Sequence, residues 1–456
     1  MKKAHWLLLV ACGVLYAIPF LLHEYAWWLI FVFPVPLFYI GCIENLSFIH
    51  GYIWGVITFS LHFSGGIYIL ADMAHEWWVV GLVLGIAVIL YQAFFCGICF
   101  WVSGYIIRVF SVKKPIMRLW IWVLLLWLFI IWVDGYSMWI FGVQEGYPFM
   151  HPLILLAKRP ALLYLLPLIG KQWLTGLFLS ISMSIVWLWW YKNISAMLFF
   201  GLIMGIWGYG LIDEVKVKSV PWHIRIKSLP HMICSTTKNP LVTIKIIGNH
   251  IKKIVTDYPE TDLIIMPESA CNIDNFADIP ELLLLWNDVH VGKAIHIVFG
   301  ASRWEKGNYY NSLHWVYNGV LQDCCDKRHG MLISERLPTW IDGDYVRDIY
   351  FSVTPPITIS GCPRKKICMA DITFVPYICS ELFFNEWPED FYHDNTIIAI
   401  VNDSIFLNNM CVKYIQKLLV LLAQFKAIQW QRDIVYVSYA QSLFIDKQGR
   451  CTLINE

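Results

Sequence analysis

The sequence predicts an α-helical transmembrane bundle followed by an α/β sandwich domain. Of its 456 residues, 58% are hydrophobic and only 15% are charged, and the mean hydropathy is +0.57. This balance is typical of membrane proteins. The two halves differ: charges are rare up to about Asp213, whereas apolar and polar residues alternate from there to Glu456, as in a soluble domain.

The net charge of +1 argues against nucleic acid as the main partner. The 13 cysteines lack the spacing of a disulfide framework, and we find no Cys/His pattern with zinc spacing. Cys12, Cys42, Cys96 and Cys99 lie in apolar runs, where we interpret them as small packing residues. We therefore expect no metal and no cofactor.

Seven apolar segments have about the length that a hydrocarbon core of roughly 30 Å requires. Lys2 and Lys3 precede the first segment, which we interpret as an uncleaved helix, with a cleaved signal peptide as the alternative. The predicted spans are Trp6–Leu22, Trp27–Cys42, Tyr52–Ala71, Val79–Ile107, Leu119–Val133, Trp173–Trp190 and Met197–Ile212.

The distribution of Lys and Arg predicts the orientation, because cytoplasmic loops carry an excess of both. With the N-terminus inside, the cytoplasmic segments hold Lys2, Lys3, Arg108, Lys113, Lys114, Arg118 and Lys192. The opposite segments hold only Lys158, Arg159 and Lys171. Seven spans then place the second domain on the periplasmic face of the inner (cytoplasmic) membrane of a Gram-negative bacterium, as part of a multi-pass protein.

Residues 134–172 are aromatic and apolar but are interrupted by prolines, with Lys158 and Arg159 in the middle. We interpret this stretch as an interfacial arm on the outer face, where Trp and Tyr prefer to lie. The alternative is an eighth span, which would put the second domain in the cytoplasm. The expected organisation is a transmembrane domain over 1–213, a linker over 214–240 and a catalytic domain over 241–456.

The second domain is expected to alternate strands and helices, as layered α/β sandwiches do. A helix is predicted from Asn249 to about Tyr258 and another over Met410–Trp430. Asn318-Gly319 predicts a hairpin turn. The predicted strands are Leu241–Ile247, Leu263–Met266, Ala294–Gly300, Asn311–Tyr317, Val320–Cys325, Ile367–Cys379 with an irregularity, Thr396–Val401, Ile434–Tyr439 and Ser442–Ile445.

Three chemically reactive side chains follow predicted strands. Glu268 comes after the run that ends at Met266, Lys327 comes after the hairpin, and Cys379 ends the run from Ile372. Chemistry collects at the carboxyl ends of strands in sheets that carry helices. A carboxylate, an ammonium and a thiol in these places suggest a base, a cation and a nucleophile.

These residues resemble the motifs of the carbon–nitrogen hydrolase (nitrilase) superfamily. With the many-span N-terminal part, the chain resembles its apolipoprotein N-acyltransferases, over nearly the whole chain. The matching segments, in family order, are Pro267-Glu268-Ser269, Tyr310-Asn311-Ser312, Asp326-Lys327, Glu335 followed by Pro338, Cys379-x-Glu381 and Asn402-Asp403-Ser404-x-Phe406.

The resemblance implies a nitrilase-like αββα sandwich with Glu268 as general base, Lys327 as cation and Cys379 as nucleophile. Glu335, Ser380, Glu381 and Asn402 would support them. It also implies acyl transfer from a phospholipid donor, through a Cys379 thioester, to the N-terminal amine of an apolipoprotein. Membrane lipid is then a partner, and we expect a monomer.

The sequence departs from the family pattern in several places. Met266 stands where the family usually has Trp, Ser380 where an aromatic is common, and Leu332-Ile333-Ser334 before Glu335 where it has Pro-Phe-Gly. The family chain also returns to the membrane through a last helix, whereas this sequence ends at Glu456. One alternative is a membrane-anchored nitrilase-like hydrolase or acyltransferase with another substrate, for example in a secretion or conjugation system. Another is an inactive scaffold.

Overall fold

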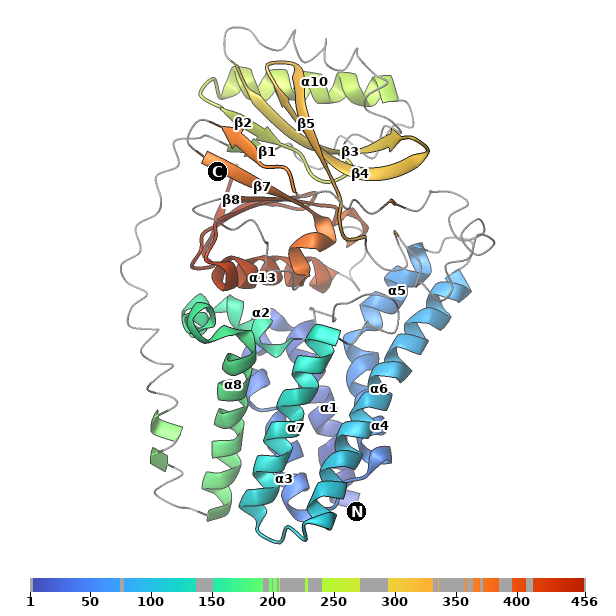
Figure 1. Ribbon diagram of the computed structural model, residues 1–456, viewed down its shortest axis with the longest axis vertical. Coiled ribbons are helices and arrows are strands. Elements are labelled where there is room, and N and C mark those ends of the chain that lie inside the picture. Colours follow the sequence, from blue (N-terminus) through green and yellow to red (C-terminus); the bar gives the residue numbers. More distant parts are fainter. Residues whose placement is uncertain are drawn as a thin grey trace. The chain divides into compact units, whose positions relative to one another are not determined.

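The computed structural model describes residues 3–73, 78–136, 151–191, 197–198, 200–202, 205, 226–228, 240–270, 294–330, 335, 357–358, 364–369, 372–384, 396–406 and 413–454. The chain divides into two compact units (Figure 1). A helical unit comprises residues 1–217 and 410–429, and a β-rich unit comprises residues 218–409 and 430–456.

The helical unit is built from apolar helices joined by short turns. Its helices are α1 (Lys3–Leu21), α2 (His23–Ala26), η1 (Trp27–Phe31), α3 (Pro34–Ile43), α4 (Phe48–His62), α5 (Ser64–Met73), α6 (Trp78–Val109), α7 (Pro115–Tyr136), η5 (Pro152–Lys158), η6 (Pro160–Leu163), α8 (Leu166–Tyr191) and α13 (Lys413–Trp430). All but the last residue of α13 group with this unit. Tyr414 of α13 donates a hydrogen bond to the carbonyl of His62, and Lys417 pairs with Glu24.

Among the described residues, five helical segments are long and apolar enough to cross a membrane. They are Lys3–Leu21, His23–Ile43, Gly81–Val109, Pro115–Gly135 and Leu166–Trp190. On α6, the apolar side chains of Val83, Ile86, Leu90 and Phe94 are all more than 40% exposed. They recur at the three- and four-residue spacing of one helix face, as expected for a surface that lies against lipid.

Five of the seven predicted spans agree with these segments. The predicted span Tyr52–Ala71 is divided between two shorter helices, α4 and α5, which meet at Phe63. At this break the Ser64 hydroxyl donates a hydrogen bond to the backbone carbonyl of Leu61, in the last turn of α4. Most of the seventh predicted span, Met197–Ile212, lies outside the described residues.

The predicted arm is only partly described, since residues 137–150 fall outside the described ranges. Its middle forms the two 3-10 turns η5 and η6, and residues 153–157 are fully buried in the helical unit. Its two ends are joined, because Lys171 forms an ion pair with Asp134. Residues 153–157 of the arm are therefore buried, whereas Lys158, Arg159 and Leu168 are exposed, and the placement of the arm at a membrane interface stays a prediction.

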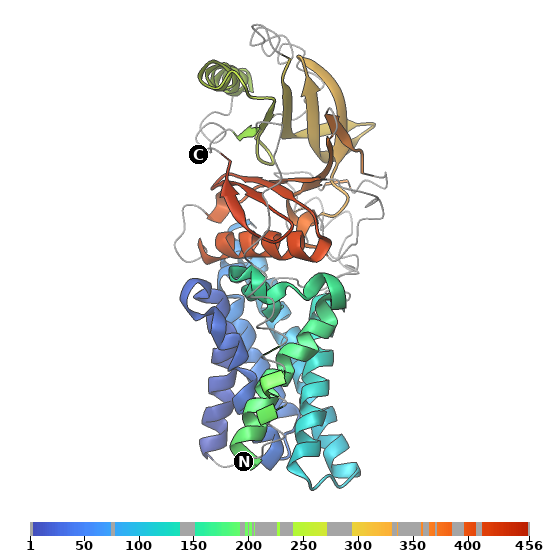
Figure 2. The same cartoon turned by 90° about the vertical axis from the view of Figure 1, so that its left-hand side faces the viewer.

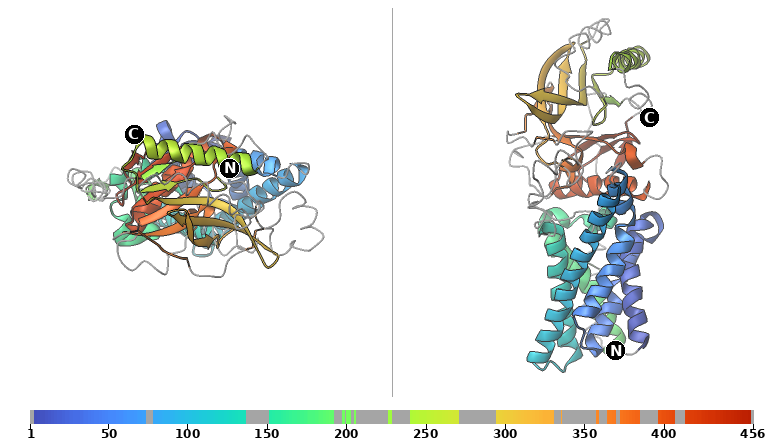
Figure 3. Two further views of the ribbon diagram at one scale, coloured as in Figure 1. Left: turned by 90° about the horizontal axis from the view of Figure 1, so that it is seen from above. Right: turned by 90° about the vertical axis from the view of Figure 1, so that its right-hand side faces the viewer.

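Helices α4 and α6 lie side by side (Figures 1 and 3). Gly51 and Gly55, four residues apart on α4, make this approach possible. A Cβ added at Gly51 would lie 2.4 Å from the carbonyl oxygen of Cys96, and one at Gly55 would lie 2.6 Å from the Cα of Ala93. Small residues at this spacing are the usual way for membrane helices to pack closely.

The β-rich unit contains two sheets. In the described residues, one has the order β1-β2-β3-β4-β5 and the other β11-β10-β9-β8-β7-β6. The strands are β1 (Ile226–Ser228), β2 (Leu263–Ile265), β3 (His296–Glu305), β4 (Asn308–Tyr317), β5 (Val320–Asp326), β6 (Ile367–Met369), β7 (Ile372–Ile378), β8 (Thr396–Val401), β9 (Ile434–Ser438), β10 (Ser442–Ile445) and β11 (Cys451–Leu453). Three neighbouring strands in each sheet are parallel: β1 to β3 and β7 to β9.

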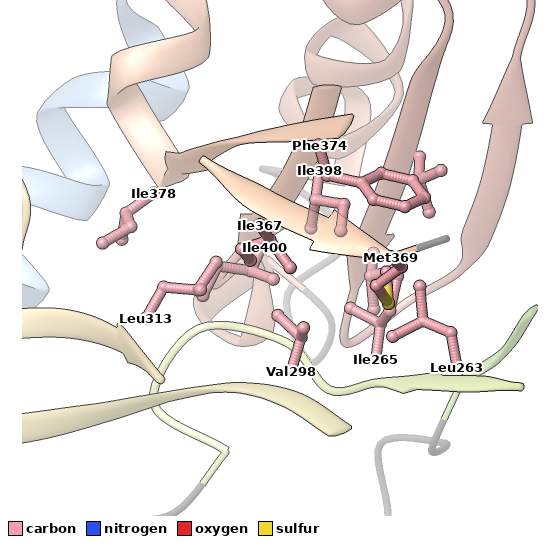
Figure 4. Close-up of a cluster of buried hydrophobic side chains, with 12 residues drawn as sticks. Leu263, Ile265, Val298, Leu313, Ile367, Met369, Phe374, Ile378, Ile398 and Ile400 are labelled. Carbon is pink, nitrogen blue, oxygen red and sulfur yellow. The ribbon is translucent and has the colours of Figure 1, made fainter. Parts of the chain in front are cut away.

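The two sheets pack face to face through one apolar layer (Figure 4). Leu263 and Ile265 of β2 and Ile398 and Ile400 of β8 all belong to this layer. Because side chains alternate along a strand, Ile264 points the other way, towards helix α10 (Pro240–Asp257). Figure 2 shows α10 on the outer face of the first sheet, the face that does not pack on the second sheet.

Most predicted strands are confirmed, and so is the hairpin. Asn318 and Gly319 have φ values of 50° and 71°, as a type I′ turn needs at both central positions. The strand predicted over Leu241–Ile247 is wrong, because these residues belong to α10. Ile247, Ile251 and Ile254 recur at helical spacing and pack on the first sheet, and this burial overrides the strand preference of the β-branched run.

Two further corrections concern strands. The described residues 226–228, assigned to the linker, form β1 and pair in parallel with β2. The run predicted as one irregular strand over Ile367–Cys379 is two antiparallel strands, β6 and β7. The hydrophobic pattern continues across both, so it does not reveal the reversal between them.

We predict that Gly55→Ala destabilises the helical unit, because the new methyl group would meet backbone on α6. Overpacking of this kind typically costs about 1–3 kcal/mol. Thermal unfolding in detergent measures the loss. The matched control is Gly66→Ala on α5, whose Cβ would meet only a side-chain atom at an ordinary 3.5 Å. Equal unfolding temperatures for the two variants would contradict the close packing of α4 on α6.

Candidate active site

Three loops bring the predicted catalytic side chains together in the β-rich unit. Glu268 follows β2, Lys327 follows β5 and Cys379 follows β7. The Lys327 ammonium lies 3.2 Å from Oε1 of Glu268. The Cys379 thiol is close enough to both side chains for their charges to act on its pKa. The two sheets thus contribute to one site, the first through the carboxylate and the ammonium and the second through the thiol.

Lys327 is the buried cation of this site. Its side chain is 1% exposed and lies between two carboxylates, 3.2 Å from Glu268 and 2.7 Å from Glu335. Burial opposes the charge, but the two carboxylates outweigh it and raise the pKa of the ammonium well above its ordinary value. Lys327 is therefore charged at every physiological pH.

Asn311 is a site residue that the sequence analysis did not single out beyond its triplet. Its amide Nδ2 donates to Oε1 of Glu268 at 2.7 Å and to Oε1 of Glu335 at 3.4 Å. Its backbone carbonyl oxygen accepts a hydrogen bond from the backbone N–H of Lys327 at 2.8 Å. Asn311 thus holds both carboxylates and the start of the lysine loop, and the Tyr310-Asn311-Ser312 triplet was the signal that could have identified it.

The position of Glu268 depends on a close backbone contact. A Cβ on Gly300 of β3 would lie 2.7 Å from the Cα of Glu268 and 2.7 Å from the amide nitrogen of Ser269. Ser269 itself has a φ of 56°, in the left-handed region that non-glycine residues rarely adopt. Only glycine at position 300 leaves room for this turn.

Asn402 contributes to the site through its backbone. Its N–H donates to Oε2 of Glu268 at 3.0 Å. Its side-chain oxygen accepts instead from the N–H of Ser404 at 3.2 Å and from the Ser404 hydroxyl at 2.6 Å. The side chain therefore shapes the turn after β8, and the turn presents the N–H to the carboxylate.

Cys379 lies at a sharp change of direction. The residue before it, Ile378, is anchored in the layer between the sheets (Figure 4), and the 3-10 turn η10 (Cys379–Phe383) begins at the cysteine. Its φ is 50°, a region that costs a non-glycine residue about 1–3 kcal/mol and persists only where the surrounding structure enforces it. Such strain is typical of side chains that a fold must aim at a substrate.

The thiol of Cys379 is protonated at rest. Burial is the largest cause that raises its pKa well above the ordinary value, and the charge of Glu268 adds to it, while Lys327 acts in the opposite direction. The proton is therefore on the sulfur at neutral pH, with the Glu268 carboxylate nearby. The structure brings the predicted base and the predicted nucleophile into one buried site, and their roles in catalysis stay predictions.

Ser380 and Glu381 follow the thiol. The Ser380 hydroxyl donates to the carbonyl of His329 at 3.3 Å, on the lysine loop. Glu381 accepts the backbone N–H of Arg328 at 2.5 Å and that of Ile378 at 2.9 Å. Both predicted supporting residues thus link the cysteine turn to the lysine loop.

A second set of contacts fixes the residue before the lysine. Asp326 accepts two hydrogen bonds from Arg303, at 3.1 Å and 2.6 Å, and one from the Ser312 hydroxyl at 2.6 Å. These side chains come from β3, β4 and β5, so they lock the end of the hairpin that carries Lys327. In the described part of the chain, no group of three or more His, Cys, Asp or Glu side chains could hold a metal ion.

Comparison with protein-family models and with curated proteins found no match. Among solved structures, the chain is similar to an amidase of the nitrilase superfamily from Nesterenkonia AN1. The identity is 9% and the TM-score 0.38, over 50% of this chain and 85% of that one. It is also similar to a carbon–nitrogen hydrolase from Helicobacter pylori G27, with 14% identity and a TM-score of 0.36 over 51% of this chain and 86% of that one.

A third similar structure is a nitrilase-superfamily member from Saccharomyces cerevisiae, with 14% identity and a TM-score of 0.35 over 50% of this chain and 84% of that one. The structural neighbours are thus carbon–nitrogen hydrolases of the nitrilase superfamily.

We predict that Asn311→Asp slows the alkylation of Cys379 with iodoacetamide on the order of tenfold to a hundredfold. This factor corresponds to the free energy of one lost hydrogen bond to a charged group. The new carboxylate would also compete for Lys327. Peptide mass spectrometry follows the modified cysteine. The control is Asn308→Asp, which adds the same charge at an exposed place on β4. An unchanged rate in Asn311→Asp would show that the amide does not hold the carboxylates.

We predict that alkylation of Cys379 in the wild-type protein is slow at neutral pH and still rising at pH 9. Its raised pKa means that the reactive thiolate forms only at high pH. Lys327→Met should shift the profile higher still, because the cation that favours the thiolate is gone. A rate that reaches its plateau below the free-thiol pKa of about 8.5 would contradict this assignment.

Proposed function

We propose that this protein is a membrane-bound acyltransferase. It moves a fatty acyl chain from a phospholipid to the N-terminal amine of an apolipoprotein, through a thioester on Cys379. The observation that carries the proposal is the buried site that gathers Glu268, Lys327 and Cys379: the ammonium lies 3.2 Å from the carboxylate, and both charges act on the thiol. A nucleophile, a base and a cation in one buried site are the parts that two-step acyl transfer needs.

The first half of the reaction forms the thioester. Glu268 takes the thiol proton as sulfur attacks the ester carbonyl of the phospholipid. The carbonyl oxygen becomes an oxyanion, which then collapses and breaks the bond to the glycerol oxygen. Glu268 returns the proton to that oxygen, so the products are a lysophospholipid and an acyl chain on Cys379.

The oxyanion needs a positive partner that is already in place. Lys327 supplies a full charge with almost no exposure to water, and the backbone N–H of Ser380, at the start of η10, supplies a hydrogen bond. Loss of one donor of this kind typically costs about 10²–10³ in rate.

The second half transfers the acyl group to nitrogen. The amine attacks the thioester carbonyl and gives a proton to Glu268, and the carbon–sulfur bond breaks to leave an amide. Glu268 then returns its proton to the thiolate. Glu335, which lies 2.7 Å from Lys327, keeps the ammonium in position through both halves.

The apolar helices favour a lipid as the acyl donor. Five described segments of this same chain are long and apolar enough to span a bilayer. A diacyl lipid cannot leave the membrane at low cost, since each buried CH₂ group is worth about 0.8 kcal/mol. A catalytic unit on the same chain as the spans would meet its donor at the membrane surface. We place that surface on the periplasmic side of a bacterial inner membrane.

Two features favour an active site over a scaffold. Cys379 is held in a strained conformation, and Lys327 is buried beside two carboxylates. Both arrangements cost stability, and such costs are concentrated at functional sites.

A second candidate is a hydrolase or acyltransferase with another substrate. Ser380, next to the nucleophile, has a small side chain that is engaged with His329, so it offers no aromatic surface to an acyl chain. If the amine is absent or different, water or another nucleophile would clear the same thioester.

We predict that detergent-solubilised protein mixed with phosphatidylethanolamine gains one acyl group on Cys379, detectable by mass spectrometry. A diacylglyceryl lipopeptide with a free N-terminal amine should remove it and become N-acylated. Cys379→Ala and Glu268→Gln should give no adduct. An adduct that water clears but the lipopeptide does not would favour the second candidate. No adduct on folded protein would exclude a phospholipid donor.

A further inference from the structure

The carboxylate of Glu381 joins the backbones on both sides of the catalytic centre. Its Oε1 accepts the N–H groups of Arg328 at 2.5 Å and His329 at 3.3 Å, which directly follow Lys327. Its Oε2 accepts the N–H of Ile378 at 2.9 Å, which directly precedes Cys379. One side chain therefore sets the spacing between the loop with the ammonium and the turn with the thiol.

Arg364 holds this carboxylate from behind. Its Nη1 lies 2.7 Å from Oε2 of Glu381 and also donates to the carbonyl of Pro376 at 3.3 Å. Its guanidinium stacks over the ring of Tyr377, 4.0 Å from the ring centre. Arg364 lies just before β6, the antiparallel neighbour of β7. Its contacts with Pro376 and Tyr377 therefore hold the end of β7, directly before the nucleophile.

A buried carboxylate needs such a partner. Glu381 is 2% exposed and Arg364 is 8% exposed, so neither charge is well solvated. Burial acts to raise the pKa of Glu381, but Arg364 outweighs it and keeps the pKa below its ordinary value. An ionised carboxylate can accept the three backbone N–H groups, whereas a protonated one would spend an oxygen as a donor.

We propose that Arg364 is a positioning residue of this site, acting through Glu381 to fix Lys327 against Cys379. The geometry uses a feature that lysine lacks: a planar guanidinium that lies over the ring of Tyr377 while its Nη1 donates to Pro376 and Glu381. The inference rests on the nucleophilic role of Cys379 in the proposed function. It does not depend on which acyl donor or acceptor the enzyme uses.

The test is the pH profile of Cys379 alkylation by iodoacetamide, measured on the full-length protein in detergent by peptide mass spectrometry. In Arg364→Gln we expect the rate at pH 8 to fall by about 10²-fold, the typical effect of a 1 Å misplacement in an active site. We also expect the profile to move to higher pH, because Lys327 no longer stabilises the thiolate. A purely structural role would lower the unfolding temperature without moving the profile.

Lys365→Gln is the matched control. It removes a cation from the neighbouring residue, whose ion pair with Asp323 is about half exposed. We expect a wild-type profile for this variant. A folded Arg364→Gln variant whose rate and profile also match the wild type would overturn the proposal.

Arg364→Lys covers the case in which Arg364→Gln does not fold. It keeps the buried cation but loses the planar fork, so we expect a folded protein with a slower reaction and a profile shifted in the same direction. A wild-type profile in Arg364→Lys would overturn the positioning role. If wild-type Cys379 reacts with iodoacetamide but accepts no acyl group from phospholipid, the proposed function fails while this inference is still tested.

Discussion

The site depends on one interaction, the burial of the Lys327 ammonium between the carboxylates of Glu268 and Glu335. A lone ammonium in that place would lose its proton, and two adjacent carboxylates without it would repel each other. The three groups are therefore stable only together, with Asn311 bonded to both acids. The thiol then has a charged base on one side and a cation for the developing oxyanion on the other.

This cluster constrains the fold around it. Gly300 must be glycine because the turn that carries Glu268 presses against its Cα, and Cys379 must accept a positive φ for its thiol to reach that carboxylate. Glu381 ties the two loops at a fixed spacing, and Asp326 locks the hairpin from the other side. The strained turn is held in place because the cluster of buried apolar side chains between the sheets anchors Ile378 directly before the nucleophile.

The helical unit gives the same chain access to lipid. Its apolar helices pack closely through small residues on α4, and apolar side chains line the outward face of α6. Acyl chains are soluble only in such surroundings, whereas the attack on an ester and the later attack by an amine need charged groups held away from bulk water. A chain with both parts fits the proposed chemistry on the acyl ester of a membrane lipid.

The sequence by itself determined what is encoded within a few neighbouring residues. Long apolar runs marked five of the spanning segments, β-branched runs marked β2, β8 and β9, and Asn318-Gly319 marked the hairpin. The order of Glu268, Lys327 and Cys379 at strand ends pointed to one site. Tertiary structure decided what depends on distant partners. Packing of Ile247 and Ile251 on the first sheet favoured a helix where a strand was predicted over Leu241–Ile247. The fold also brought Asn311 and Arg364 to carboxylates 43 and 17 positions away in the sequence, so no local pattern records these contacts.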